Sequence, residues 1–493
     1  MNLRNSYERI KTKLSKPLLG EALRAKVMRG GVWLGGGNVA EQASRFARNI
    51  ILTRLLAPSA FGAMAIVMSS SAIVGALTEV GMKQAVIQNP KGGEKEYLDA
   101  GWWMGLGRSL FTYLIIFAMA PWVAKFYGIA DMSALLRVTL LGTLFDGAIS
   151  PRSALAQKEL RFGRWMIISN GGAICGVILT IVLSFTLHSV WALAIGFASE
   201  NVFRCVLSYI LYPGFASLKW ERTAVRELYE FSKQAFGLSF LNLIFSRTDI
   251  FVLGKLYSAT ELGLYSMGIA LIVTPSTFLT NMFAQTLFPA LTHVQNDKAR
   301  LNRILIEVTS WLVLLGLPGV ALLWLCGRSL LSVVYGARYV AAAAPLAVAS
   351  AVVLINMLNA AITCVFTAVG RPALHRRAVA ASALVMIIAI YPACKVFGLV
   401  GGQIAALLAV IVSYLIQIVR MRELTGLDVL RYGSSVIPAT LVSAVVLAAL
   451  YCFRVFGFAT KPVANMTLGA AACIIAYVLC ALLFVKSKRA AER

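Results

Sequence analysis

Residues 31–54 read GVWLGGGNVAEQASRFARNIILTR and form the first stretch of this chain that is long enough to cross a bilayer as a helix. From position 38, polar side chains recur three, four, seven, ten and eleven residues later, which places them on one face of a helix. They are Asn38, Glu41, Gln42, Arg45, Arg48 and Asn49. Charged side chains are tolerated at membrane depth where they face protein or water, so this helix predicts an internal cavity.

The composition is that of a membrane protein. Of 493 residues, 59% are hydrophobic and 14% are charged, a balance that soluble globular domains do not show. We therefore attribute the net charge of +25 to membrane topology and to the cavity, and expect no nucleic-acid partner. The eight cysteines form no CxxC motif and the three histidines fall in separate predicted loops, so no disulfide framework or metal site is predicted.

Hydropathy predicts an all-α polytopic membrane protein of about fourteen transmembrane helices. The predicted spans are 31–54, 60–88, 98–125, 133–150, 165–187, 190–211, 231–254, 262–290, 304–326, 339–368, 377–394, 398–419, 433–453 and 463–485. Residues 1–29 are basic, and we interpret them as either an amphipathic helix on the anionic inner leaflet or a disordered tail.

The distribution of positive charge sets the predicted orientation. With the N-terminus in the cytosol, the inward-facing segments hold 31 Lys and Arg residues and the outward turns hold eight. This asymmetry places both termini in the cytosol of a multi-pass protein. Seven basic residues are left within the predicted spans: Arg45, Arg48, Lys83, Arg108, Arg137, Arg204 and Arg247.

An internal repeat divides the chain into two halves. Residues 48–64 align without a gap on 249–265, so that Gly62 matches Gly263. Six helices repeated in one orientation predict two pseudo-twofold-related lobes that bind substrate between them and alternate its access. The predicted units are an N-lobe (30–212), a cytosolic linker (213–230), a C-lobe (231–419) and a segment of two extra helices with a basic tail (420–493).

The basic residues within the spans fall into two groups. Three follow a glutamate by four residues, which predicts the local ion pairs Glu41–Arg45, Glu79–Lys83 and Glu200–Arg204. Arg48, Arg108, Arg137 and Arg247 have no carboxylate three or four positions away. Either a carboxylate on another helix, such as Asp146 or Asp249, or an anionic ligand must compensate them. A guanidinium group matches the oxygens of a diphosphate two at a time.

The seventh predicted helix carries a second polar stripe. Its members recur at helical spacing: Ser239, Asn242, Ser246 and Asp249. Because this helix repeats the 31–54 helix, we expect the two stripes to face each other across the cavity. Asp249 aligns with Arg48, and two roles stay open for it: an ion pair with Arg48, or protonation coupled to transport.

Four segments carry a resemblance to a known family. They are RNIILTRLLAPSAFGAMAI (48–66), VWALAIG (190–196), SRTDIFVLGKLYSATELGLYSMGIAL (246–271) and LFPALTHVQNDKARL (287–301). The chain resembles the polysaccharide transporters of the multidrug/oligosaccharidyl-lipid/polysaccharide flippase superfamily, in particular exopolysaccharide exporters of the colanic acid or succinoglycan type. The resemblance implies a flippase in the bacterial inner membrane that moves undecaprenyl-diphosphate-linked oligosaccharide units for exopolysaccharide or lipopolysaccharide biosynthesis.

Charge and position select the candidate site residues. The predicted substrate-binding set is Asn38, Arg45, Arg48, Asn49, Arg108, Arg137, Asn242 and Arg247, and the candidate coupling carboxylates are Glu41, Asp146 and Asp249. No cofactor or metal is expected, and a proton or sodium gradient would drive transport. Expected partners are the lipid-linked oligosaccharide, anionic inner-leaflet lipids, and a polysaccharide polymerase and copolymerase.

Three alternative functions are considered. A multidrug antiporter of the same superfamily would need an acidic or aromatic cavity, and an arginine-rich one repels organic cations. A lipid II flippase shares the diphosphate carrier and is the nearer alternative. A membrane glycosyltransferase or polymerase needs catalytic groups on an ordered outward loop, whereas every predicted outward turn is short and lacks an acidic pair. We therefore predict that the protein is not an enzyme.

Overall fold

The computed structural model describes residues 21–437, apart from 79–85, 87–88, 90, 130, 160, 218–220 and 233–235, and beyond 437 only 440–441, 444 and 471. Three predictions fall largely outside the described residues. They are the structure of residues 1–20, the Glu79–Lys83 pair, and the two C-terminal helices at 433–453 and 463–485.

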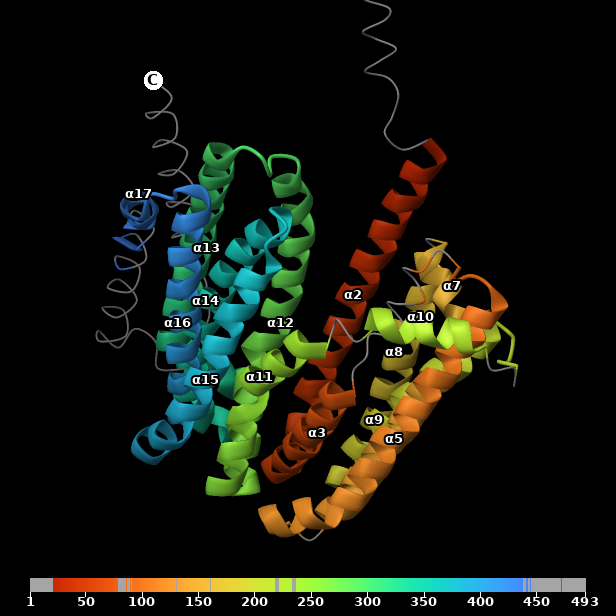
Figure 1. Ribbon diagram of the computed structural model, residues 1–493. Helices are drawn as coiled ribbons and strands as arrows, with labels where there is room; N and C mark the ends of the chain where they lie inside the picture. The colour runs from red at the N-terminus through yellow and green to blue at the C-terminus, as the bar shows by residue number, and fades with distance from the viewer. Residues whose placement is uncertain are drawn as a thin grey trace, which may run out of the picture.

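The N-lobe consists of six long helices, which Figure 1 draws in red to yellow. They are α2 (Glu21–Leu55), α3 (Pro58–Thr78), α5 (Lys95–Tyr127), α6 (Met132–Gly147), α8 (Phe162–Leu187) and α9 (Val190–Leu211). A short helix, α7 (Ser153–Lys158), joins α6 to α8. α2 begins ten residues before its predicted start, because EALRAKVMR (21–29) consists of residues with good helix propensity and contains no helix breaker.

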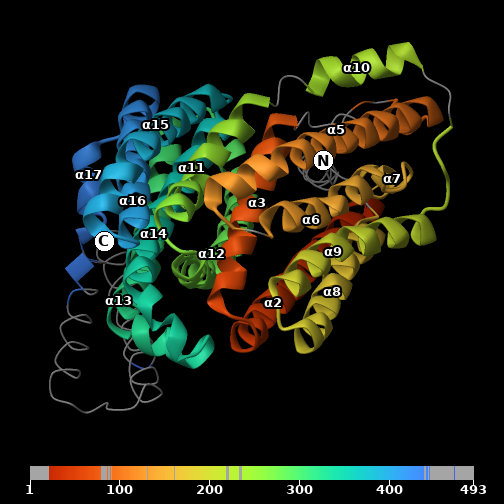
Figure 2. The same cartoon turned by 90° about the horizontal axis from the view of Figure 1, so that it is seen from below.

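The C-lobe repeats the six-helix arrangement (Figures 1 and 2). Its long helices are α11 (Phe236–Leu256), α12 (Ala259–Thr292), α13 (Lys298–Val334), α14 (Ala343–Ala368), α15 (Pro372–Phe397) and α16 (Val400–Thr425). A 3₁₀ turn, η2 (Ala337–Ala342), precedes α14, and the short α17 (Val429–Ser434) follows α16. No strand occurs in the part of the chain that the structure describes, and the predicted all-α architecture is confirmed.

Nine of the described helices are long and apolar enough to cross a membrane. Of the remaining long helices, α6 has only 16 residues and α2 carries one of the two predicted polar stripes.

The segment between the lobes is fastened to the N-lobe. It contains a helix that the sequence analysis missed, α10 (Arg222–Ser232), which packs on α5 (Figure 2). The Trp103 indole donates a hydrogen bond of 2.8 Å to the Ser217 carbonyl, and the Tyr97 hydroxyl donates one of 2.8 Å to Glu227. The second bond lowers the pKa of the Glu227 carboxyl. The linker and the N-lobe are thus connected as one unit at this face.

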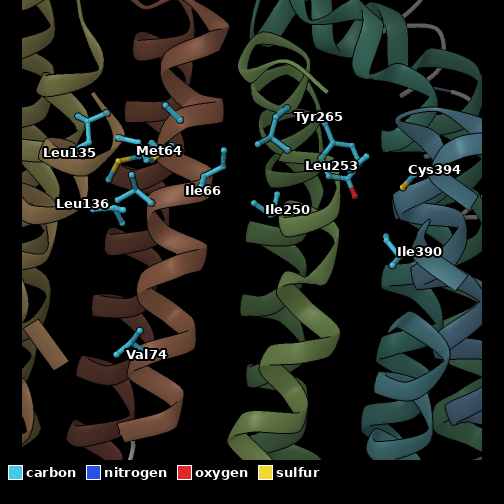
Figure 3. Close-up of a cluster of buried hydrophobic side chains, with 14 of the residues drawn as sticks. Met64, Ile66, Val74, Leu135, Leu136, Ile250, Leu253, Tyr265, Ile390 and Cys394 are labelled. Atoms are coloured by element: carbon cyan, nitrogen blue, oxygen red, sulfur yellow. The ribbon is translucent and has the colours of Figure 1, made fainter. Parts of the chain in front are cut away.

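The two lobes meet along α3, which packs on both α11 and α12. A hydrophobic cluster crosses this boundary, and Figure 3 shows it: Met64 and Ile66 of α3 belong to the same cluster as Leu253 of α11 and Tyr265 of α12. At the end of the bundle where α2 and α11 finish, which we call the junction end, Leu52 and Leu56 contact a second cluster that includes Tyr335. The hydrophobic core is therefore continuous across the lobe boundary.

Two glycines matched by the repeat make reciprocal contacts at this boundary. A Cβ atom on Gly62 would lie 1.9 Å from the carbonyl oxygen of Ala259, and one on Gly263 would lie 1.8 Å from that of Pro58. Pro58 and Ala259 are themselves repeat partners. Such exchange of equivalent contacts is what a pseudo-twofold axis between the lobes requires. Small residues at this point let the two backbones approach closely, as in other membrane helix pairs.

Two basic residues matched by the repeat also cross the boundary. Arg54, at the end of α2, donates a hydrogen bond of 3.0 Å to the Val333 carbonyl at the end of α13. Lys255, at the end of α11, donates one of 2.6 Å to the Phe126 carbonyl at the end of α5. Helix C-termini carry partial negative charge, which favours a cation. Each lobe thus holds the third helix of the other at the junction end.

The glycine contact gives a first prediction. Gly62→Ala and Gly263→Ala should each lower the thermal stability of the purified protein, because overpacking against a backbone carbonyl costs about 1–3 kcal/mol. Gly75→Ala is the matched control on α3, since a Cβ there meets nothing within 4 Å. Thermal unfolding in detergent measures the difference. Equal melting temperatures for Gly62→Ala and Gly75→Ala would show that the close approach does not stabilise the lobe interface.

Candidate functional site

Four charged side chains form a continuous chain inside the N-lobe. Arg45 Nε lies 3.0 Å from Glu41 Oε1, and the Arg45 guanidinium also contacts Glu200 of α9. Glu200 Oε1 is 2.7 Å from Arg204 Nη2. The predicted pairs Glu41–Arg45 and Glu200–Arg204 are both present. The link between them joins helices α2 and α9, which sequence spacing could not reveal. We call these four residues the N-lobe charge chain.

Glycines on α8 make room for the charge chain. A Cβ on Gly172 would lie 2.3 Å from Arg204 Cγ, and one on Gly176 would lie 2.8 Å from Glu200 Cβ. Glu200 is only 4% exposed, so its carboxylate depends on the two guanidinium groups for compensation. The four-residue spacing of the glycines matches the four-residue spacing of the charges they face.

Arg48 follows the charge chain on the same face of α2. The chain contains two carboxylates and two guanidinium groups, so Arg48 gives the cluster a net charge of +1. Within the described residues Arg48 forms no ion pair, and its Nε is buried without a hydrogen-bond partner. Its Nη2 is 3.5 Å from Asn49 Oδ1, which is long for a hydrogen bond. The arrangement leaves a positive charge that an anion can compensate.

The remaining predicted arginines are not gathered at this cluster. Arg108 of α5 donates a hydrogen bond of 3.2 Å to the Gly75 carbonyl of α3. Arg137 of α6 places its Cζ 4.1 Å from the centre of the Phe117 ring, a cation–π contact within the N-lobe. Arg247, on α11 of the other lobe, is exposed. Of the predicted guanidinium groups, the structure brings together only Arg45 and Arg48.

The predicted asparagines differ in exposure. Asn38 of α2 and Asn242 of α11 are exposed, and Asn49 is half-buried beside Arg48. Exposed amides on helices of membrane-spanning length are expected to face water rather than lipid. The two exposed asparagines therefore agree with the predicted polar stripes of the two first helices.

Asp249 belongs to a separate polar cluster in the C-lobe. Its Oδ2 accepts a hydrogen bond of 2.8 Å from the Tyr265 hydroxyl, and Gln403 Nε2 donates one of 2.7 Å to the same hydroxyl. Its Oδ1 accepts one of 2.8 Å from the Ile250 N–H. No ion pair joins Asp249 to Arg48 among the described residues. The sequence analysis did not select Tyr265 or Gln403 as site residues. Each is a polar side chain within a mainly apolar helix, and that feature of the sequence could have identified them.

Asp146 lies on a third helix, α6. The next residue, Gly147, packs against α5, where a Cβ would lie 2.4 Å from the Ser109 Oγ. The three candidate coupling carboxylates therefore lie on three different helices, with Glu41 in the charge chain and Asp249 in the C-lobe cluster.

Two six-helix lobes that exchange equivalent contacts, with polar groups on the first helix of each, define a polytopic membrane protein of the two-lobe flippase and transporter fold. A solved structure of the lipid II flippase MurJ, inward closed, has the same fold with a TM-score of 0.76 at 12% identity, covering 93% of this chain and 99% of that one. An inward-facing multidrug resistance MATE transporter matches with a TM-score of 0.59 at 14% identity, covering 78% and 95%.

The chain belongs to the polysaccharide biosynthesis protein family, whose model matches residues 51–344. It is 20% identical over 323 residues to the lipopolysaccharide biosynthesis protein WzxC of Escherichia coli K12, covering 64% of this chain and 65% of that protein. It is 23% identical over 300 residues to the succinoglycan biosynthesis transport protein ExoT of Rhizobium meliloti, covering 60% of each. These matches span less than two thirds of either relative, and they confirm the predicted family resemblance.

The charge chain gives a second prediction. Glu200→Gln removes the carboxylate shared by Arg45 and Arg204, and should destabilise the protein by about 3–5 kcal/mol because Arg204 then loses its ion pair and Arg45 keeps only Glu41. Glu41→Gln should cost clearly less, because Glu41 is more exposed than Glu200 and, among the described residues, pairs with Arg45 alone. Thermal unfolding of the purified variants compares the two. Equal destabilisation would contradict the central role of Glu200.

Proposed function

We propose that this protein is a flippase that translocates undecaprenyl-diphosphate-linked oligosaccharide units across the bacterial inner membrane for exopolysaccharide or lipopolysaccharide biosynthesis. The observation that carries the proposal is Arg48, a buried guanidinium without an ion-pair partner in the described chain beside a neutral charge chain. The family and the names of WzxC and ExoT support the same class of substrate.

In the proposed mechanism, Arg48 binds the diphosphate. Its planar guanidinium donates two parallel hydrogen bonds to phosphate oxygens, which a lysine cannot reproduce. The charge chain holds Arg45 in place and, being neutral, does not itself compete for the anion. The lobes then rock about the reciprocal Gly62–Gly263 contact, while Arg54 and Lys255 release and reform their bonds at the junction end.

The proposal also specifies the orientation of the protein in the membrane and the molecules with which it interacts. The junction end faces the periplasm and both termini are cytosolic, as the charge asymmetry of the loops predicts. Basic residues of the cytosolic loops attract anionic inner-leaflet lipids, and a polymerase and copolymerase receive the product on the other side.

Two features disfavour the alternatives. A cluster with a net charge of +1 disfavours organic cations, and hence a multidrug antiporter. The described connections at the junction end are short, such as residues 188–189 and 257–258, and leave no room for the catalytic loop of a glycosyltransferase. Lipid II remains the nearest alternative cargo because it shares the diphosphate, and the fold likeness to MurJ alone does not separate the two headgroups.

We also propose that transport is coupled to an ion gradient, with a proton the first candidate and sodium the alternative. Asp249 supports this idea because its carboxylate is held inside the C-lobe by Tyr265 and not by a basic side chain. Gain or loss of a proton there would change the hydrogen bonds among Asp249, Tyr265 and Gln403, which join α11, α12 and α16.

The diphosphate role of Arg48 gives a third prediction. Arg48→Lys keeps the charge but loses the fork and should reduce polymer export about 5–50-fold, and Arg48→Ala should reduce it further. Lipid-linked units should accumulate in the inner leaflet at normal protein levels. Lys395→Ala, which removes an exposed cation at the junction end, is the control and should export normally. Wild-type export by Arg48→Ala would contradict the diphosphate role.

Coupling gives a fourth prediction. Asp249→Asn alone, and together with Glu41→Gln, should make export insensitive to external pH, because neither amide can exchange a proton. Asp131→Asn, in the α5–α6 connection, is the control carboxylate. Export measured across external pH decides the matter. Unchanged pH dependence in the double variant would place the coupling group elsewhere.

Topology gives a fifth prediction. A cysteine at residue 188, in the α8–α9 connection, should react with a membrane-impermeant thiol reagent added to intact cells. A cysteine at residue 296, in the α12–α13 connection, should react only after the cells are opened. Labelling of residue 296 from outside would reverse the proposed orientation.

A further inference from the structure

α12 has a polar face that the diphosphate site does not use. Thr277, Asn281 and Gln285 recur at four-residue spacing and are exposed, and the exposed Phe288 follows on the same side of the helix. In the described structure the amides of Asn281 and Gln285 make no hydrogen bond to protein. We call these four residues the amide face.

The amide face is distinct from the lipid-facing side of the same helix. Leu279 is 54% exposed and, two residues before Asn281, lies about 160° round the helix from it. The exposed side of α12 that carries Leu279 therefore differs from the side that carries Asn281. An unpaired amide is costly in lipid, which favours an aqueous environment for Asn281.

The repeat shows that the fold does not require all of the amide face. In the gapless register that pairs Gly62 with Gly263, Thr277 corresponds to Ala76 and Asn281 to Val80, whereas Gln285 corresponds to Gln84. The sequence of the first repeat is therefore apolar at two of these three places. The Asn281 amide is particular to the C-lobe repeat, and a ligand gives it a role that the fold does not require.

Position relates the amide face to Arg48. At about 1.5 Å per residue, Arg48 lies about 10 Å from the end of α2 at the junction. Thr277 and Gln285 lie about 27 and 39 Å from the start of α12, which is at the same end of the bundle. A ligand that touches both sites must be elongated. An oligosaccharide of several sugar units spans this separation, whereas a single sugar does not.

We propose that the amide face binds the uncharged sugar residues of the headgroup whose diphosphate Arg48 holds. The inference rests on the proposed flippase function. It adds that the N-lobe binds the diphosphate and the C-lobe binds the sugars of the same headgroup. Side-chain amides donate and accept hydrogen bonds at once, as neighbouring sugar hydroxyls do. The 39%-exposed ring of Phe288 offers a flat surface for the C–H face of a pyranose. α12 has no charged residue after Glu261, so this face does not compete for phosphate.

The test compares two probes on the purified full chain. One is undecaprenyl diphosphate, and the other is the lipid-linked oligosaccharide extracted from producing cells that lack the protein. Asn281→Ala with Gln285→Ala should weaken binding of the glycosylated lipid at least about tenfold and change binding of undecaprenyl diphosphate less than about twofold. Leu279→Ala, on the opposite side of α12 from Asn281, is the control and should bind both probes normally. Arg48→Ala should lose both.

Each outcome is decisive. Normal binding of the glycosylated lipid by the amide variant, or equal loss of both probes, overturns the inference, as does a wild-type protein that binds both probes equally well. In these cases the proposed flippase function is still supported if Arg48→Ala no longer binds undecaprenyl diphosphate. Failure of the wild-type protein to bind either probe would instead contradict the proposed function. If the alanine variant does not insert, Asn281→Ser with Gln285→Ser keeps a polar surface and should give the same selective loss.

Discussion

The cost of charge at membrane depth is the constraint on which the N-lobe depends. Glu200 is almost fully buried, and it is kept there by guanidinium groups from its own helix and from α2. That requirement fixes the rotation of α2 relative to α9, because Arg45 must reach Glu200 while it also contacts Glu41. The glycines of α8 then follow, since only small residues leave room for the charged pair. Arg48 is oriented by the same helix and has no ion-pair partner in the described chain.

A second constraint comes from the symmetry of the lobe boundary. Matched residues exchange contacts at Gly62 and Gly263, and matched cations reach matched helix ends from Arg54 and Lys255. Beyond these exchanged contacts, the lobes are joined by side-chain packing of α3 on α11 and α12. A boundary of this kind suits rigid-body movement of one lobe against the other, since the contacts that break are hydrogen bonds and apolar packing and not covalent links.

The sequence predicted most of the helical architecture, and the reasons for its errors are physical. The hydropathy pattern predicted both ends of α9, at residues 190 and 211. It placed the start of α2 at residue 31 instead of 21, because the basic residues of the first turns lower the mean hydropathy there. The pairs Glu41–Arg45 and Glu200–Arg204 could be read from spacing on one helix. The Arg45–Glu200 contact and the Asp249–Tyr265–Gln403 cluster could not, because they join residues distant in sequence.

The candidate site is asymmetric within a symmetric fold, and this has a consequence for transport. Matched helices α2 and α11 both carry polar stripes, but α2 holds Arg48, whose Nε is buried without a hydrogen-bond partner, whereas Asp249 on α11 is hydrogen-bonded by neutral groups. A cargo with an anionic end and a large uncharged end would bind more strongly by its diphosphate to one lobe and by its sugars to the other. Rocking of the lobes then changes the distance between the two attachment points. Under the proposed function, release would become easier when that distance no longer matches the headgroup, so the same asymmetry that orients the cargo would also favour its departure on the opposite side.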